Sequence, residues 1–138
     1  MYNKILVTLD CTPTDRAIIE HIKQLAKMAK SRVVLLHVAD GWAARFFGPD
    51  AVSPEVKQDM EYLEKIKTEF LSENIQAEVE LAYGEPASEI IKWVQSETCD
   101  LIAMSTHGHK FFSDLFLGTT ASHVRHNITI PVLLLKGK

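Results

Sequence analysis

The chain has 138 residues, of which 46% are hydrophobic and 24% are charged, and its formal net charge is −3 at pH 7. These values are typical of one globular domain spanning residues 1–138. The acidic balance argues against a nucleic-acid-binding protein, which usually carries a basic surplus, and the apolar runs are too short to cross a bilayer.

The first residues and the cysteines indicate where the protein works. The N-terminus leads directly into a strand-like run, without the pattern of a signal peptide. Cys11 and Cys99 have a spacing that matches neither a metal site nor a disulfide framework. We therefore expect reduced thiols and a cytoplasmic location.

Strand-like apolar runs alternate with segments of helical periodicity along the chain. The expected strands are residues 4–9, 32–38, 76–83, 101–104 and 130–135. Apolar residues recur at helical spacing between the first two strands. A long helix is expected to begin near Pro54, with Ser53 as its cap. Another helix follows Gly84-Glu85-Pro86, and the last helix is expected to end near Asn127.

Five strands separated by helices predict an α/β fold, an open parallel sheet with helices on both faces. The strand orders 2-1-3-4-5 and 3-2-1-4-5 are both common, and ligands bind at the crevice where the order reverses. A glycine-bearing loop follows the fourth strand, and it lies at that crevice only in the order 3-2-1-4-5. That order also places Asp10 opposite Ser105, so we predict it.

The glycine-bearing loop lies within STHGHKFFSDLFLGTT, residues 105–120. Ser105, Gly108 and Gly118 have the spacing S-x2-G-x9-G, and Thr119 and Thr120 follow. Glycine lets the backbone approach a ligand and turn amide groups toward an anion, and the start of a helix favours a phosphate. A glycine turn with a threonine cap and no ligand is the alternative interpretation of the same residues.

Together with several further motifs, this loop resembles the universal stress protein family over essentially the whole chain. The motifs are Val7-Thr8-Leu9-Asp10, Leu36-His37-Val38, Gly84-Glu85-Pro86-Ala87, Met104-Ser105-Thr106-His107-Gly108, Gly118-Thr119 and Ile130-Pro131-Val132-Leu133. The resemblance implies a five-stranded 3-2-1-4-5 fold, Rossmann-like and similar to the adenine nucleotide alpha hydrolases, and a homodimer. Members that bind ATP carry the loop G-x2-G-x9-G followed by Ser or Thr.

The resemblance also implies a set of nucleotide-binding residues. Asp10 would bond the ribose hydroxyls, the Val38 backbone would read the adenine edge, and Met104 would pack near the base and ribose. The phosphates would be held by the amides of Gly108, His109, Gly118 and Thr119 and by the Thr119 hydroxyl. Thr8, Ser105 and Thr120 complete the expected site for ATP, with or without Mg²⁺.

Two positions depart from the pattern of the ATP-binding members. Ser105 stands where the first loop glycine is usual, and Cys11-Thr12 replace the Gly-Ser that often follows the aspartate of the first strand. Serine is small enough for a close backbone approach, unless the position needs a positive φ. The resemblance therefore favours nucleotide binding less strongly than a full match would.

The histidines fit structural roles. We expect His37 to be a hydrogen-bonded core residue, and His123 and His126 to face solvent or cap the last helix. No metal site is expected, because no set of His, Cys and Asp shows ligand spacing on one element. The aromatic residues Trp42, Phe46 and Phe47 either cover a nucleotide or a partner's surface, or pack at the sheet edge.

Three functions stay open at this point. The first is a nucleotide-binding stress-response module whose occupancy changes its interactions. The second is the same fold without nucleotide, acting through protein contacts alone. The third is a slow ATPase, although the sequence has no G-x-S-x-G elbow, Walker loop or G-x-G-x-x-G motif.

The last strand predicts how the protein assembles. In the order 3-2-1-4-5 it lies at the sheet edge, and Pro131, which lacks an N–H, suits an edge strand. An apolar edge is an association hazard that proteins cover or pair. We therefore expect a homodimer through this strand, with Ile130, Val132 and Leu134 in the contact.

Overall fold

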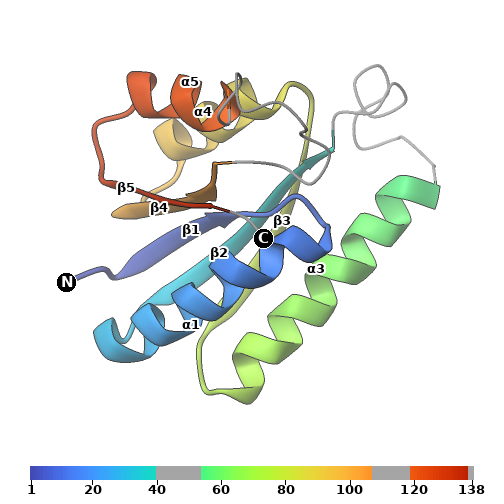
Figure 1. Cartoon of the computed structure of the whole chain (residues 1–138), viewed down its shortest axis with the longest axis vertical. Helices are drawn as coiled ribbons and strands as arrows, with labels where there is room; N and C mark the ends of the chain where they lie inside the picture. The colour runs from blue at the N-terminus through green and yellow to red at the C-terminus, as the bar shows by residue number, and fades with distance from the viewer. Residues whose placement is uncertain (40–53, 107–118, 137–138) are drawn as a thin grey trace.

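In the computed structural model, residues 1–39, 54–106 and 119–136 are described. A sheet of five parallel strands in the order β3-β2-β1-β4-β5 forms the centre (Figure 1). The strands are β1 (Lys4–Thr8), β2 (Arg32–Ala39), β3 (Ala77–Tyr83), β4 (Leu101–Ser105) and β5 (Val132–Leu135). The predicted α/β fold and the order 3-2-1-4-5 are confirmed.

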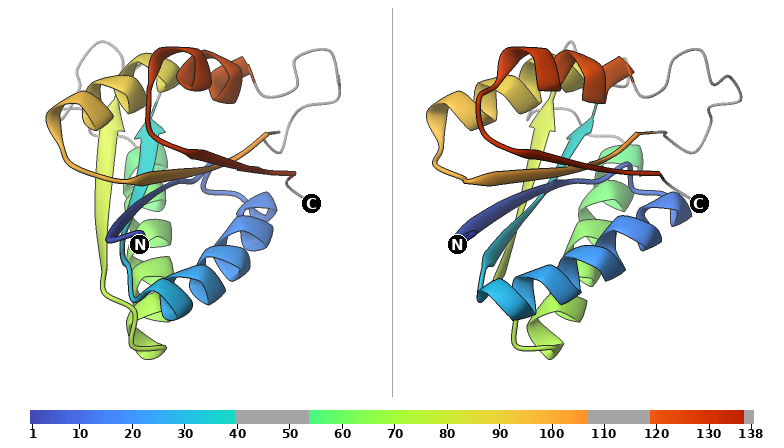
Figure 2. Two further views of the ribbon diagram at one scale, coloured as in Figure 1. Left: turned by 90° about the vertical axis from the view of Figure 1, so that its left-hand side faces the viewer. Right: turned by 60° about the vertical axis from the view of Figure 1, so that its left-hand side comes forward.

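The helices lie on both faces of the sheet. They are the short 3-10 helix η1 (Pro13–Asp15) and the α-helices α1 (Arg16–Ala29), α3 (Pro54–Ser72), α4 (Pro86–Ser96) and α5 (Thr119–Asn127). Helices α1 and α3 cover one face, and α4 and α5 cover the other (Figures 1 and 2). None of the helices in the described parts of the chain combines the length and apolarity needed to cross a membrane.

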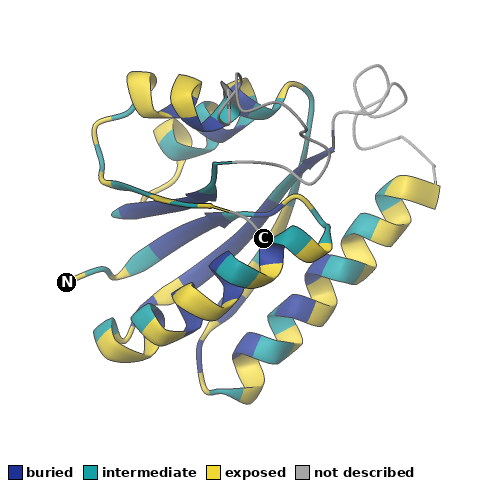
Figure 3. Cartoon of the chain, in the orientation of Figure 1, coloured by how far each residue is buried: buried dark blue, intermediate teal, exposed yellow. Residues whose placement is uncertain are grey.

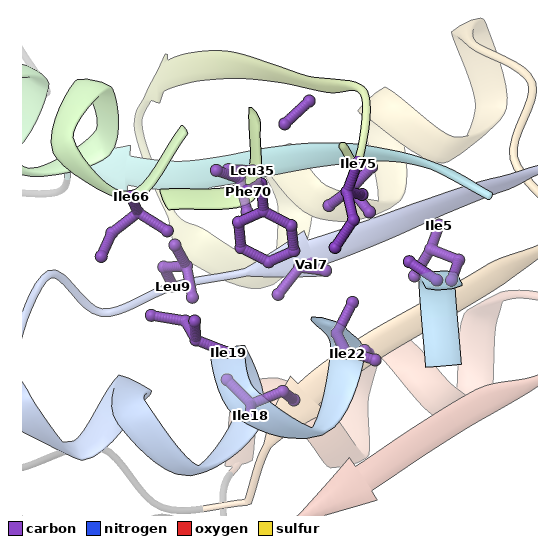
Figure 4. Packing of buried hydrophobic residues seen from close by; sticks show 14 of the residues in the cluster. Ile5, Val7, Leu9, Ile18, Ile19, Ile22, Leu35, Ile66, Phe70 and Ile75 are labelled. Atoms are coloured by element: carbon purple, nitrogen blue, oxygen red, sulfur yellow. The ribbon is translucent and has the colours of Figure 1, made fainter. Parts of the chain in front are cut away.

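Alternation along the strands divides the core into two clusters, because successive side chains point to opposite faces. Ile5, Val7 and Leu9 pack against Ile18, Ile19 and Ile22 of α1 and against Ile66 and Phe70 of α3 (Figure 4). Leu6, Val34, Leu36, Val38, Ile102 and Met104 pack on the other face, with Ala87 and Ile90 of α4 and Val124 of α5. The strands β1, β2 and β4 are accordingly mostly buried, whereas the edge strands β3 and β5 are only partly buried. The outer surfaces of the helices are exposed (Figure 3).

The motif Gly84-Glu85-Pro86-Ala87 has an architectural role. Gly84 has a φ of +138°, which L side chains rarely adopt, and a Cβ there would lie 3.1 Å from Glu89 Oε2. The Glu85 carboxylate caps α4 by accepting hydrogen bonds from the N–H groups of Ala87 at 2.7 Å and Ser88 at 3.3 Å. The motif therefore reverses the chain after β3 and starts the next helix.

The last strand is shorter than the sequence predicts. It begins at Val132 rather than Ile130, because Pro131 has no N–H to donate; its carbonyl accepts from Ile102 N–H at 3.0 Å. Ile130 lies before the strand, and both Ile130 and Val132 are partly buried against the cluster on the α4 and α5 face. Leu134 is 37% exposed, and it is therefore the residue of the three most available to a partner.

Candidate functional site

The chain reverses its direction of travel across the sheet between β1 and β4. From β1 it crosses through α1 to β2 on one side, and from β4 it crosses through α5 to β5 on the other. The two strands are paired in register up to Val7 and Ala103. Ligands of open α/β sheets bind at the carboxyl ends of the strands at such a point, which we call the β1–β4 switch point.

Several predicted site residues surround the carboxyl ends of the central strands. Thr8 ends β1, Ser105 ends β4, and Val38 is the second-last residue of β2. Val38 and Met104 belong to the same cluster on the α4 and α5 face, and alternation from Leu6 places Thr8 on that face too. The sheet thus brings together the residues predicted on β1, β2 and β4.

The remaining predicted residues are placed only in part. Thr119 and Thr120 begin α5, and Thr120 is half-buried. The predictions for Gly108, His109 and Gly118, and for the aromatic residues Trp42, Phe46 and Phe47, lie outside the described residues.

Asp10 lies two residues after the end of β1. Its backbone N–H donates to Asp15 Oδ1 at 2.9 Å, but no described residue donates a hydrogen bond to its own side chain. The residue is exposed at the surface, yet the protein surrounds the carboxylate closely enough to weaken its hydration. This desolvation, followed by the nearby charge of Asp15, raises the pKa of Asp10 to about 6, against the opposing effect of His37.

Ser105 presents a second polar group at the carboxyl end of β4. Its Oγ atom is buried, and it makes no hydrogen bond within the described residues. An unpaired buried hydroxyl costs free energy on the order of 1–3 kcal/mol, so such groups in native proteins call for an explanation, such as a ligand or a water.

The turn after β1 is held by Asp15, which is 1% exposed. Its carboxylate accepts hydrogen bonds of 2.9 Å from the Cys11 N–H and from the Tyr62 hydroxyl of α3, in addition to the bond from Asp10. Sequence analysis missed this role. The signal was present, since Thr12-Pro13-Thr14-Asp15 has the T-x-x-D form of a helix start.

A cluster of Cys11, His37 and Asp59 lies on the opposite face of the sheet from Val38. Here His37 is hydrogen-bonded as predicted, with Nδ1 2.7 Å from the Leu9 carbonyl oxygen. Its Nε2 lies 3.2 Å from Asp59 Oδ2 of α3, and the ligand atoms of all three residues lie within 4.8 Å of one another. Sequence spacing missed the cluster because its members come from three elements.

On the last helix, His123 and His126 are exposed, as predicted. The ring of His126 makes a hydrogen bond through Nδ1 to the Ser122 carbonyl oxygen at 3.0 Å. Both residues lie in the helix that begins at Thr119, and they face away from the buried cluster around Val124.

The model of the universal stress protein family matches residues 1–136, so the chain belongs to this family. Universal stress protein MJ0577 of Methanocaldococcus jannaschii is 28% identical over 157 residues, which cover 100% of this chain and 97% of that protein. The solved structure of MJ0577 matches with a TM-score of 0.86 and covers 100% of this chain and 98% of that chain.

Two other solved structures share the fold and hold nucleotides. A universal stress protein from Archaeoglobus fulgidus in complex with dAMP has a TM-score of 0.72 at 18% identity, and covers 98% of both chains. A universal stress protein in complex with cAMP also has a TM-score of 0.72, at 13% identity, and covers 99% of this chain and 98% of that chain.

Proposed function

We propose that this protein binds an adenine nucleotide at the β1–β4 switch point and acts as a cytoplasmic regulatory module in the response to stress. The observation that carries the proposal is the pair of unpartnered polar groups at this point. The Asp10 carboxylate lies just beyond the end of β1, and the buried Ser105 hydroxyl belongs to the last residue of β4. Neither side chain has a hydrogen-bond partner among the described residues.

Asp10 suits the ribose. An ionised carboxylate only accepts hydrogen bonds, so its natural partners are the donors of a diol such as the ribose 2′- and 3′-hydroxyls. A pKa of about 6 leaves the carboxylate mostly ionised at neutral pH. The bond from its backbone N–H to Asp15 holds the residue in place before any ligand arrives.

The end of β2 suits the adenine edge. The Leu36 carbonyl accepts from Leu9 N–H at 2.8 Å, and the Ala39 carbonyl accepts from Gly84 N–H at 3.1 Å on the β3 side. Because backbone groups alternate between the two sides of a strand, the N–H and C=O of Val38 point to the same side as those of Leu36. There β1 has already ended at Thr8, so these groups have no backbone partner among the described residues and can bond a base.

The start of α5 suits the phosphates. A helix of nine residues begins at Thr119, and its first N–H groups and its dipole favour an anion. We assign the phosphates to this end of the helix, together with the amides of Gly108, His109, Gly118 and Thr119. The complexes of two family members with cAMP and dAMP support an adenine nucleotide, and we propose ATP, with Mg²⁺, as the ligand.

We also propose a homodimer through β5. This strand pairs only with β4 among the described strands, and the side chain of Leu134 is exposed beside it. A two-fold partner offering the same strand would cover this edge.

Isothermal titration of ATP into wild-type protein and three variants tests the nucleotide site. Asp10→Ala removes the ribose acceptor, and Gly118→Val places a branched side chain where the phosphates would approach. We expect each to weaken binding at least about tenfold, which corresponds to about 1.4 kcal/mol. Glu78→Ala, an exposed carboxylate on β3, serves as the matched control and should bind like wild type.

Two results would refute this site. One is wild-type affinity in a folded Asp10→Ala protein, which would remove the ribose assignment. The other is wild-type affinity in a folded Gly118→Val protein, which would remove the phosphate assignment. Absence of binding by the wild-type chain would instead favour the same fold acting through protein contacts alone.

A further inference from the structure

Cys11, His37 and Asp59 bring a thiol, an imidazole and a carboxylate together from the turn after β1, from β2 and from α3. Their ligand atoms all lie within 4.8 Å of one another. The distance from His37 Nε2 to Asp59 Oδ2 is 3.2 Å. Two such ligands of a tetrahedral zinc ion, each about 2.0 Å from the metal, are about 3.3 Å apart, so this pair already has the separation that a shared metal requires.

The hydrogen bond at Nδ1 of His37 determines whether Nε2 carries a hydrogen. The Leu9 carbonyl oxygen, 2.7 Å from Nδ1, can only accept, so Nδ1 carries the hydrogen. Nε2 then faces the Asp59 oxygen, another acceptor, and a cation must lie between them: a proton or a metal ion. Histidines that bind metals commonly donate their second ring N–H to a backbone carbonyl in this way.

The charges around Cys11 favour a cation. Three carboxylates, those of Asp59, Asp15 and Asp10, lie near the Cys11 thiol. Within the described residues no lysine or arginine forms an ion pair with Asp59. A bound metal ion would take the place of the thiol proton and offset this negative charge.

The backbone prepares the thiol for this role. Cys11 has a φ of +62°, a left-handed conformation that is uncommon for residues other than glycine. The Asp15 carboxylate holds it there by accepting the Cys11 N–H at 2.9 Å. The side chains of His37 and Asp59 are also restrained, being only 15% and 24% exposed. The three ligands are therefore largely held in position before a metal ion binds.

We propose that Cys11, His37 and Asp59 bind a divalent transition-metal ion of the zinc class, with a remaining coordination position open to water. Sulfur, nitrogen and oxygen donors together favour Zn²⁺ over Mg²⁺ or Ca²⁺, which prefer all-oxygen sites. The proposal does not rest on the proposed nucleotide function, because His37 faces α3 while Val38 and Met104 face α4 and α5.

The test uses the full chain, treated with a chelator and kept free of nucleotide. Zn²⁺ binding is measured by calorimetry, and Co²⁺ is added as a spectroscopic probe whose thiolate charge-transfer band reports a cysteine ligand. We expect one ion per chain and a Co²⁺ charge-transfer band in the wild type. Cys11→Ser should abolish the band, and Asp59→Asn should weaken Zn²⁺ binding at least about tenfold.

Cys99→Ser is the matched control, because Cys99 is the other cysteine and lies at the amino end of β4, whereas Cys11 lies past the carboxyl end of β1. It should bind both metals like wild type. Asp59 is partly exposed on α3, so Asp59→Asn tests the site even where Cys11→Ser does not fold. Failure of the wild type to bind Zn²⁺, persistence of the charge-transfer band in Cys11→Ser, or wild-type affinity in Asp59→Asn would overturn the proposal.

Discussion

The carboxylate of Asp15 accepts a hydrogen bond of 2.9 Å from the backbone N–H of Asp10, and so holds a residue of the turn after β1 from five positions further along the chain. The same carboxylate accepts the Cys11 N–H and the Tyr62 hydroxyl. One buried side chain therefore positions Asp10 of the proposed nucleotide site and Cys11 of the proposed metal site, and links both to α3.

Asp15→Ala should destabilise the protein by about 3 kcal/mol, because the backbone N–H groups of Asp10, Cys11 and Thr12 lose their carboxylate acceptor. The Tyr62 hydroxyl also loses its bond to Asp15 and keeps only the Thr12 carbonyl oxygen at 3.2 Å. Tyr62→Phe removes only one of the bonds to Asp15 and should cost about 1 kcal/mol. Urea denaturation followed by circular dichroism measures both values. A free energy of unfolding for Asp15→Ala within about 0.5 kcal/mol of wild type would show that the turn does not depend on this carboxylate.

Acid should weaken the contact between α1 and α3. Glu69 accepts two hydrogen bonds from Arg16, at 2.6 and 3.0 Å, and one from Lys23 at 3.0 Å. The pKa of Glu69 is lowered from 4.5 to about 2, and the hydrogen bonds from Arg16 are the largest cause. A lowered carboxyl pKa stabilises the fold above the unfolded value, so this contribution is present above pH 4.5 and is lost as the pH falls toward 2.

The matching variant is Glu69→Gln, which we expect to be less stable than wild type by about 1 kcal/mol at pH 7. The difference should shrink as the pH falls from 5 toward 2, when wild-type Glu69 is protonated. The exposed Glu78, with no ion-pair partner among the described residues, supplies the control Glu78→Gln. A stability difference for Glu69→Gln that stays constant over this pH range would contradict the assignment.

The strand runs and the helix periodicities predicted the fold well because both are local. The order 3-2-1-4-5 also followed from the place of the glycine-bearing loop. The start of β5 was wrong by two residues, because the predicted strand followed the apolar run from Ile130 and the missing N–H of Pro131 was used only to place the strand at the sheet edge. Edge strands have one pairing partner, so their ends depend on single hydrogen bonds.

The candidate site could be predicted only for residues that belong to a recognisable motif or lie at the end of a predicted strand. Asp10 and Ser105 were predicted from their places at the carboxyl ends of strands, and Val38 from the family resemblance; their roles in binding stay predictions. The cluster of Cys11, His37 and Asp59 was not predicted, because its spacing in sequence carries no pattern; only the packing of α3 against β2 brings Asp59 to His37. Contacts between elements that are distant in sequence are determined by tertiary packing.

The dimer through β5 can be tested with a single substitution. Leu134→Lys places a charge at the exposed position of the strand, while Val132, which packs against the protein's own core, is left unchanged. We expect wild type to sediment as a dimer at concentrations on the order of tens of micromolar, and Leu134→Lys as a folded monomer. Leu71→Lys, at an exposed leucine of α3, is the control and should remain dimeric. A monomeric wild type would rule out this assembly.

The most direct test of the nucleotide-binding proposal is the melting temperature of the wild-type protein with and without ATP and Mg²⁺. A ligand that binds only the folded state adds about 2.7 kcal/mol at a hundredfold excess over its dissociation constant. For a domain of this size we expect the melting temperature to rise by about 5–10 °C. An unchanged melting temperature at millimolar ATP, and equally at millimolar AMP, would contradict the account.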